Sequence, residues 1–333
     1  MTGAGIRDVA DRAGVSVGTV SNALNHPEQV SPEARDRIRS AIAELGYVRN
    51  DAARVLRAGR SSTIGLVVLD VRNPFFTDLA RGAEEEAAQH GLSVILGNSD
   101  EHPGREAGYL DLFEEQRVRG VLISPYGDID ARLQKLHERG IGAVLVDRAS
   151  GDRRFSSVSV DDVAGGRLAV RHLLDTGRRR IAFVGGPAGI RQVADRLAGA
   201  RDAVAGVRGA TLDVVPTGAL TVLEGRRVGL ELLAGARPDA IFAANDLVAT
   251  GLLQALVMEG SARVPDDVAL IGYDDIDFAS AAMVPLSSVR QPAALIGQTA
   301  VRILLEQEED DVAAPPRQVV FQPELVVRAS TAG

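Results

Sequence analysis

The feature that most constrains the fold is an alternation of short apolar runs with helical segments, which begins at residue 62 and occurs twice. "STIGLVVLD" is an apolar run of strand length, and a helical segment, "FFTDLARGAEEEAAQHG", leads to a second run, "LSVILGNS". The pattern continues to "AVLVD", and after a joint near "FSSVSVDD" it starts again. Alternating buried strands and amphipathic helices form parallel sheets that helices cover on both faces. We therefore predict an α/β body made of two doubly wound lobes.

The limits of the two lobes follow from the order of these segments. Helices are expected at 105–117, 130–139, 162–176, 190–205, 221–234, 246–259 and 293–306. "LSSV", the last of these helices and "QVVFQPELVVRAS" are expected to cross back between the lobes. The first lobe should then comprise about 62–160 and 292–320, and the second about 161–291 and 321–333.

Polar side chains follow the strands of both lobes. The apolar runs lead into "DVRNPFF", into Asp147 and Arg148, into "ND" at 245–246 and into "DD" at 274–275. In open parallel sheets, ligands bind just beyond the carboxyl ends of the strands. Carboxylates and amides can exchange hydrogen bonds with hydroxyl groups, and aromatic rings can cover the apolar face of a sugar. The body is therefore expected to hold a small polar ligand between its lobes.

The first sixty residues have a different pattern, with three short helical segments. "IRDVADRA" places apolar residues on one face, Gly14 can end that helix, and Ser16 can cap the next one. "SPEARDRIRSAIAELGY" carries Ser31 as a cap and Pro32 in its first turn. Two short helices joined by a tight turn and braced by a third are typical of a helix-turn-helix. The second helix would bury Val20 and Leu24, and its outward positions would be Val17, Gly18, Thr19, Ser21 and Asn22.

The motifs of this segment resemble those of one family. "IRDVADRAGVSVGTVSNALN", followed by "ELGYVRNDAARVLRAGRS", is similar to the N-terminal signature of the lactose/galactose repressor (LacI/GalR) family. The resemblance implies a DNA-binding domain at 1–47, a hinge helix or linker at 48–61 and an effector-binding domain at 62–333. It also implies DNA contacts by Ser16, Val17, Gly18, Thr19, Ser21, Asn22, Asn25, Tyr47, Ala53, Leu56 and Arg57.

Within that set, Leu56 resembles the apolar wedge that family members insert into the minor groove from a hinge helix ordered on DNA. The alternative is a simple linker residue. Val17 and Gly18 stand where the family usually carries base-choosing side chains, so the family's operator sequences do not transfer. A symmetric homodimer is expected to read a pseudo-palindromic double-stranded operator.

The body resembles the ribose-type periplasmic binders and their repressor relatives. The resemblance implies effector contacts by Asn73, Phe75, Phe76, Asp147, Arg148, Arg196, Asn245, Asp275 and Gln291. Asp274 could take the place of Asp275, whereas Asp246 is expected to cap the helix at 246–259. Asn73 could instead be a turn residue, and Phe75 and Phe76 could be core residues. The expected effector is an unphosphorylated sugar, and the alternatives are a nucleobase and a phosphorylated sugar.

Composition and the absence of certain motifs argue against an enzyme or a metal-binding protein. The net charge is −8, but residues 1–60 hold nine Arg and no Lys against seven Asp or Glu, a balance of +2, which suits a DNA-binding end on an acidic body. There is no cysteine, the five His have no metal-ligand spacing, and neither G-x-S-x-G nor H-E-x-x-H occurs. We therefore expect no enzymatic activity, no metal and no cofactor.

Location and partners follow from the rest of the sequence. No apolar run reaches the length of a membrane span and "MTGAGIRD" lacks the apolar core of a signal peptide, so the protein is expected in the cytoplasm, without a membrane contact. An exported sugar-binding protein without a DNA role is thus a distant alternative. The acidic "LLEQEEDD" disfavours a phosphocarrier-protein partner. The end at "RASTAG", without a leucine-rich tail, favours a dimer over a tetramer.

Overall fold

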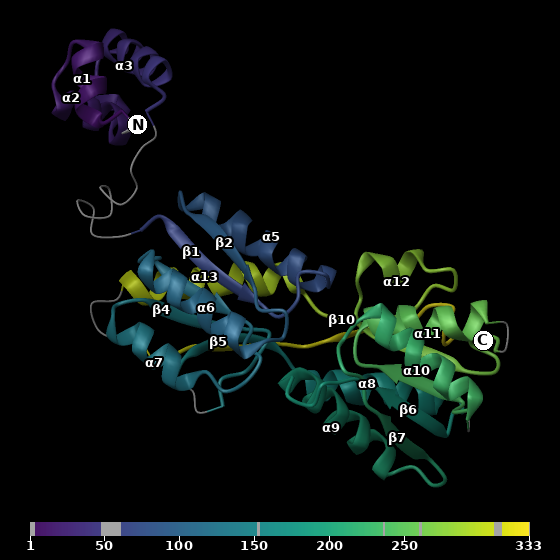
Figure 1. The fold of residues 1–333 in the computed structure, drawn as a ribbon. Coiled ribbons are helices and arrows are strands. Elements are labelled where there is room, and N and C mark those ends of the chain that lie inside the picture. The colour runs from purple at the N-terminus through teal and green to yellow at the C-terminus, as the bar shows by residue number, and fades with distance from the viewer. Residues whose placement is uncertain are drawn as a thin grey trace. The chain divides into compact units, whose positions relative to one another are not determined.

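The structure is a computed structural model, and it describes residues 4–47, 61–151, 154–235, 237–259, 262–309 and 315–332. The chain divides after Ser61 into two compact units, a small head and a large body (Figure 1).

The head is a helix-turn-helix, as the sequence predicts. Its helices are α1 (Ile6–Ala13), α2 (Val17–Asn25) and α3 (Pro32–Leu45), and a 3₁₀ turn, η1 (Pro27–Gln29), links the last two. Gly14 ends α1 in the left-handed conformation, at φ 63°, which glycine adopts without steric cost. The Ser16 hydroxyl caps α2 by accepting a hydrogen bond from the Thr19 amide at 3.0 Å. Val9, Val20 and Ile38 are at most 2% exposed and form the centre of the head core.

The body contains two six-stranded sheets, which confirms the predicted fold class. The strand order of the first sheet is β11-β5-β4-β3-β1-β2, and that of the second is β12-β10-β9-β8-β6-β7. The first sheet consists of β1 (Thr63–Val68), β2 (Ser93–Asn98), β3 (Gly120–Ile123), β4 (Gly142–Val146), β5 (Ser156–Val160) and β11 (Gln318–Phe321). The second consists of β6 (Arg180–Val184), β7 (Thr211–Val215), β8 (Ala240–Ala243), β9 (Ala269–Asp274), β10 (Ser287–Arg290) and β12 (Glu324–Val326). The described strands pair in parallel, except that β12 is antiparallel to β10.

Helices cover both faces of each sheet. In the first lobe these are α5 (Pro74–Gln89), α6 (Pro103–Glu115), α7 (Asp130–Glu138) and α13 (Ala293–Glu309); in the second they are α8 (Asp162–Asp175), α9 (Arg191–Ala205), α10 (Val222–Ala234), α11 (Asp246–Met258) and the short α12 (Asp277–Ala281). A sheet that is covered on both faces needs apolar side chains on both faces, and successive residues of β1 point to opposite faces. Leu66 and Val68 pack into the core that contains Leu79 of α5, whereas Val67 packs into the core that contains Phe113 of α6.

The segment predicted as a joint, "FSSVSVDD", is in fact mostly strand β5, which lies between β4 and β11. All five residues of β5 are buried, and its serines bond to the returning chain: the Ser156 hydroxyl accepts a hydrogen bond from the Arg317 amide at 2.9 Å, and the Ser157 hydroxyl donates to the Gln318 side chain. The serines hide the apolar pattern of a buried strand, so the sequence did not predict β5. The chain changes lobes directly after β5, at Asp161.

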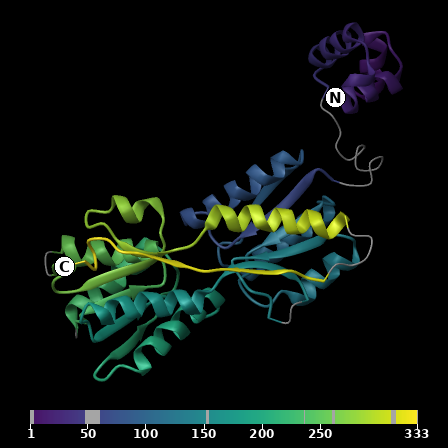
Figure 2. The same ribbon diagram turned by 180° about the vertical axis from the view of Figure 1, so that it is seen from behind.

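Three crossings join the lobes: one after β5, one between β10 and α13, and one between β11 and β12. Figure 2 shows α13 on the first lobe and the yellow C-terminal segment passing from that lobe into the second. Each lobe thus contains elements that follow segments of the other lobe in the sequence: α13 and β11 in the first lobe, and β12 in the second. Among the described helices, none combines the length and apolar character that a membrane span requires.

Candidate functional site

A pocket lies where the carboxyl ends of strands from both lobes meet. It encloses about 430 Å³ of empty space, part of it open to solvent. The lining residues come from both lobes and are Leu69, Asp70, Asn73, Phe75, Phe76, Glu101, Asp147, Ile190, Gln192, Val193, Arg196, Leu220, Asn245 and Asp274.

Two asparagines enter the pocket at helix N-termini. Asn73 caps α5 by accepting a hydrogen bond from the Phe75 amide at 3.1 Å, and Asn245 caps α11 by accepting one from the Val248 amide at 2.9 Å. The Asn73 amide group is then free to donate to the Asp274 carboxylate at 2.8 Å, across the two lobes. Asn245, and not Asp246 as predicted, is therefore the cap of α11.

Arg196 of α9 is the cation of the pocket. Its guanidinium donates to the Asp162 carboxylate at 2.8 Å and to the Ala244 carbonyl at 2.7 Å, and it lies 3.7 Å from the centre of the Tyr273 ring. Burial lowers the pKa of Arg196, but the carboxylates of Asp162 and Asp274 raise it by more than burial lowers it. The pKa is therefore raised overall, and the guanidinium stays charged. Among the lining residues it is the sole cationic side chain, against four carboxyl groups.

Asp147 and Gln192 face each other across the lobes. The Gln192 amide donates to the Asp147 carbonyl at 2.6 Å and to one of its carboxylate oxygens at 2.8 Å. The other carboxylate oxygen of Asp147 and the side-chain oxygen of Gln192 are buried without a hydrogen-bond partner. Burial raises the pKa of Asp147, and the neighbouring Asp162 raises it further. Two acceptors without a donor, inside a pocket, are what a ligand with hydroxyl groups would satisfy.

Most of the predicted effector residues meet in this pocket. Six of them line it directly: Asn73, Phe75, Phe76, Asp147, Arg196 and Asn245. Gln291 stands behind the lining, where its amide donates to Asp274 at 2.8 Å. Phe75 and Phe76 are also core residues, at 3% and 6% exposure.

Two predicted residues lie elsewhere. The Asp275 carboxylate turns away from the pocket toward Arg290 and Arg328, and Asp274 lines the pocket in its place. The backbone decides this, because both residues are in positive-φ conformations, at 100° for Asp274 and 56° for Asp275. Arg148 is absent from the lining, since its guanidinium donates to the Gly127 carbonyl.

Three polar lining residues were not predicted: Asp70, Glu101 and Gln192. Asp70 and Glu101 follow β1 and β2, so the rule that located the other residues could also have found these two, whereas Gln192 is the second residue of α9 and does not directly follow a strand. Burial and the neighbouring Asp70 raise the pKa of Glu101 to about 7. Within the ranges that the structure describes, no group of three or more His, Asp or Glu side chains could hold a metal ion.

In the head, four of the predicted DNA-contacting residues, Ser16, Val17, Gly18 and Thr19, form the cap and first turn of α2. Ser16, Gly18 and Asn22 are exposed, whereas Val17 and Thr19 are half-buried. Val17 and Tyr47 also pack against the head core. Ser21 is half-buried, and Asn25 is the last residue of α2. Ala53, Leu56 and Arg57 lie outside the described residues.

Comparison with known proteins decides the family. Residues 5–50 match the model "Bacterial regulatory proteins, lacI family", and residues 170–331 match "Periplasmic binding protein-like domain". The chain is 37% identical to the HTH-type transcriptional regulator CelR of Thermobifida fusca, over 97% of this chain and 96% of the relative. The chain belongs to the lacI family of bacterial regulatory proteins.

Other members of the lacI family resemble the chain over most of its length. It is 36% identical to the ribose operon repressor of Bacillus subtilis, with 90% of each chain covered. A lac repressor dimer bound to operator and an anti-inducer matches the whole chain with a TM-score of 0.84 at 28% identity. A CelR–cellobiose complex matches 98% of this chain and 99% of its own, with a TM-score of 0.72 at 33% identity. This lacI-family member is a DNA-binding transcriptional regulator whose body is the effector-binding part, and the relatives named here are regulators as well.

Proposed function

We propose that this regulator binds a small uncharged sugar in the pocket between its lobes and that the bound sugar changes its affinity for an operator. The observation that carries the proposal is the polar lining shared by both lobes. Asp147 and Gln192 each leave a buried acceptor unpaired, and Asn73 and Asp274 meet from opposite lobes. A sugar offers several hydroxyl donors at short spacing, so it can satisfy these acceptors and join the lobes at the same time.

The charge of the lining argues against a phosphorylated sugar. Asp70, Glu101, Asp147 and Asp274 line the pocket together with Arg196, which is already paired with Asp162. A phosphate group would place further negative charge among these carboxyl groups without a free cation to receive it. An uncharged ligand avoids this cost.

The relatives support the sugar class. One solved relative is a complex of CelR with cellobiose, and another relative is a ribose operon repressor. The pocket lining combines these polar groups with the edge-to-face pair of Phe75 and Phe76, whose ring centres are 5.1 Å apart. Such a lining suits the apolar face and the hydroxyl rim of a sugar ring. A nucleobase remains the alternative.

For the DNA-binding part, we propose that two subunits place their α2 helices in the major grooves of a pseudo-palindromic operator. The exposed face of α2, with Ser16, Gly18 and Asn22, supports this assignment. Ala53, Leu56 and Arg57 are proposed to contact the minor groove between the half-sites, as the family resemblance implies. Such a regulator works in the cytoplasm, beside the chromosome.

A ligand screen tests the effector class. Thermal melting of the full-length protein would be followed with D-ribose, D-xylose, cellobiose, hypoxanthine and D-ribose 5-phosphate, since a ligand that binds the folded state raises the melting temperature. We expect a rise with at least one of the three free sugars and none with the phosphate. Asp147→Asn should abolish the rise, whereas Asp128→Asn, which lies outside the pocket lining, should keep it. A rise with hypoxanthine alone would overturn the sugar assignment.

A further inference from the structure

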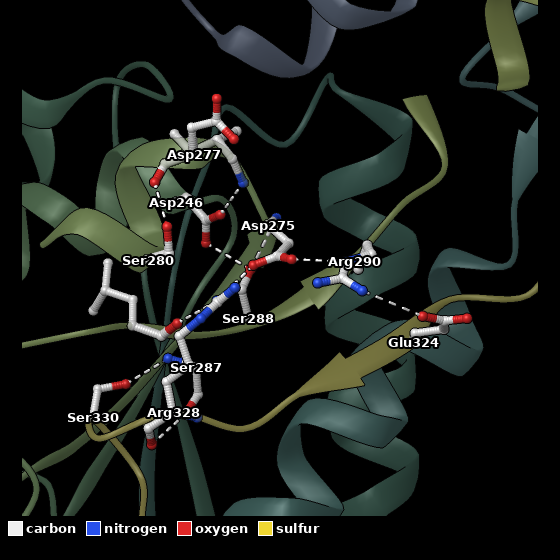
Figure 3. Close-up of polar contacts among 12 residues, drawn as sticks. Asp246, Asp275, Asp277, Ser280, Ser287, Ser288, Arg290, Glu324, Arg328 and Ser330 are labelled. Carbon is white, nitrogen blue, oxygen red and sulfur yellow. Dashed lines mark hydrogen bonds and ion pairs between the residues drawn. The ribbon is translucent and has the colours of Figure 1, made fainter. Parts of the chain in front are cut away.

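Asp275 does not line the pocket, but its carboxylate holds together chain segments at the edge of the second lobe (Figure 3). One oxygen accepts a hydrogen bond from the Arg290 guanidinium at 2.8 Å, and the other accepts one from Arg328 at 2.6 Å. The Asp275 side chain is 4% exposed, so both ion pairs are shielded from water on the carboxylate side. The Arg328 side chain is 19% exposed and that of Arg290 is 49% exposed, so the pair with Arg328 is the more buried of the two. A charged hydrogen bond to a buried carboxylate fixes geometry more strongly than a pair between two exposed side chains.

The partners of Asp275 flank two of the three crossings between the lobes. Arg290 is the last residue of β10, immediately before Gln291 and the crossing to α13. Arg328 follows β12, the strand by which the chain returns from β11, and its amide donates to the Ser287 hydroxyl of β10 at 2.8 Å. Arg290 also lies 3.7 Å from Glu324, the first residue of β12. The carboxylate of Asp275 therefore ties the end of β9 to both strands that lead across the hinge.

The backbone of Asp275 is held as well. Its amide donates to the Ser288 hydroxyl at 3.1 Å, and that hydroxyl donates to the buried Asp246 carboxylate at 2.7 Å. The second oxygen of Asp246 accepts a hydrogen bond from the Ile276 amide at 2.9 Å. Figure 3 shows the hydrogen bonds that link Asp246 to Ser288 and Ser288 to Asp275. The residue is thus fixed through both its side chain and its main chain.

This anchoring matters because the turn is strained. Asp274 and Asp275 are consecutive non-glycine residues with positive φ, at 100° and 56°, and such conformations persist only where the surroundings hold them. The strained turn directs the Asp274 carboxylate to Asn73 of the other lobe, at 2.8 Å, and to Gln291 at 2.8 Å. Asp274 is the pocket residue, and Asp275 is the residue that keeps its backbone in place.

We propose that Asp275 is a positioning residue for the effector pocket, which acts through Asp274 and links pocket occupancy to the two crossings. Without its two ion pairs the turn relaxes, Asp274 leaves its place between Asn73 and Gln291, and the crossings lose a common anchor. The affinity part of this proposal rests on the proposed sugar binding, whereas the anchoring of the crossings does not.

The test compares Asp275→Asn with Glu324→Gln in the full-length protein. The control removes the charge at the exposed end of the same network, where the Glu324 side chain is 72% exposed. Hydrogen exchange without ligand is followed in peptides that cover 270–278, 286–292 and 322–329. We expect faster exchange in all three regions for Asp275→Asn and no change for Glu324→Gln. Unchanged exchange in Asp275→Asn would overturn the proposal even if no sugar binds.

Affinity for D-ribose, measured by calorimetry, provides the second readout. We expect Asp275→Asn to weaken D-ribose binding at least tenfold and Glu324→Gln to leave it within twofold. The double variant Asp274→Asn/Asp275→Asn should bind no more weakly than Asp274→Asn alone, because one residue acts through the other. Multiplied losses in the double variant would overturn the positioning role. If Asp275→Asn does not fold, Arg290→Gln, which removes one of the two ion pairs, should show the same pattern at smaller amplitude.

Discussion

At the scale of single residues, the body is built around one buried guanidinium among several carboxyl groups. Arg196 contacts Asp162 directly and lies 3.7 Å from Asp274, and these three side chains are at most 6% exposed. Burial raises the pKa of Asp162 and of Asp274, and Arg196 opposes that rise in both. Without Arg196, the carboxyl groups of Asp162 and Asp274 would be buried without a cation, and the folded protein would be destabilised.

Arg196→Met is expected to lower the free energy of unfolding by about 3–5 kcal/mol, because it leaves Asp162 and Asp274 buried without their cation. Urea unfolding at pH 7 measures the change. The matched control is Arg191→Met on the same helix, which breaks the exposed i,i+4 pair with Asp195 and should cost at most about 1 kcal/mol. Equal losses in the two variants would contradict this account of the pocket.

Glu101 gives a pH dependence with a defined sign. Burial and the Asp70 carboxylate raise its pKa from 4.5 to about 7 in the folded protein. The folded state therefore binds an extra proton between these two pH values, and the contribution of Glu101 to stability is lost as the pH rises through this window.

Glu101→Gln removes that dependence. Discounted for its partial exposure, the variant should be more stable than the parent by about 1 kcal/mol at pH 8, and the advantage should vanish near pH 4.5. Urea unfolding at both pH values measures the difference, and Glu115→Gln, on the exposed face of α6, serves as control. An advantage of Glu101→Gln that is independent of pH would refute the assignment.

The candidate site shows what a sequence can and cannot predict about single residues. The rule that ligands bind beyond the carboxyl ends of strands located Asp147, Asn73, Asn245 and the pair at 274–275. It could not decide which aspartate of the pair faces the pocket, because the choice depends on two positive φ angles and on Arg328, which is 53 positions away in sequence. Long-range partners of this kind leave no local signal.

At the scale of elements, local signals predicted the helices well and one strand poorly. The helix expected at 162–176 is observed as Asp162–Asp175, and the one expected at 246–259 is Asp246–Met258. These helices have clear caps and apolar faces. The sequence did not predict strand β5 because three of its five residues are serines, and two of these, Ser156 and Ser157, find hydrogen-bond partners only in the folded sheet. Periodicity cannot detect such a strand, since its burial depends on distant chain.

The cap of α2 links local stability to DNA binding. Ser16→Ala removes the hydrogen bond from the Thr19 amide and should destabilise the start of α2 by about 1 kcal/mol. Ser31→Ala removes the corresponding cap of α3, where the Ala34 amide donates at 3.3 Å, and is the matched control. Hydrogen exchange should accelerate at the N-terminus of the helix whose cap is lost, and nonspecific affinity for a random duplex at low salt should fall more for Ser16→Ala. A larger fall for Ser31→Ala would contradict the role given to α2.

At the scale of the whole molecule, the two lobes of the body are joined by three crossings and by hydrogen bonds across the pocket. Asn73 bonds to Asp274 and Gln192 bonds to Asp147, each pair with one partner from either lobe. A ligand that replaces or adds to these bonds changes the relative free energies of the open and closed arrangements. Such a difference in affinity between two arrangements is what allosteric control requires.

The quaternary structure follows from the proposed operator symmetry. A dimer is expected, with a light-scattering mass of twice the 35.1 kDa chain. The measurement should be made over a range of concentrations without DNA. A mass of four chains at all concentrations would contradict the dimer, and a mass of one chain would remove the basis for a symmetric operator.

The central claim, that occupancy of the pocket controls DNA binding, is tested most directly by operator affinity with and without sugar. A duplex selected from random DNA by the full-length protein would be titrated by fluorescence anisotropy, in the absence and in the presence of saturating D-ribose. We predict that D-ribose changes the Kd at least about tenfold in one direction, in line with typical allosteric couplings, and that Asp147→Asn removes this change. An identical Kd under both conditions, with D-ribose shown by calorimetry to be bound, would contradict the account.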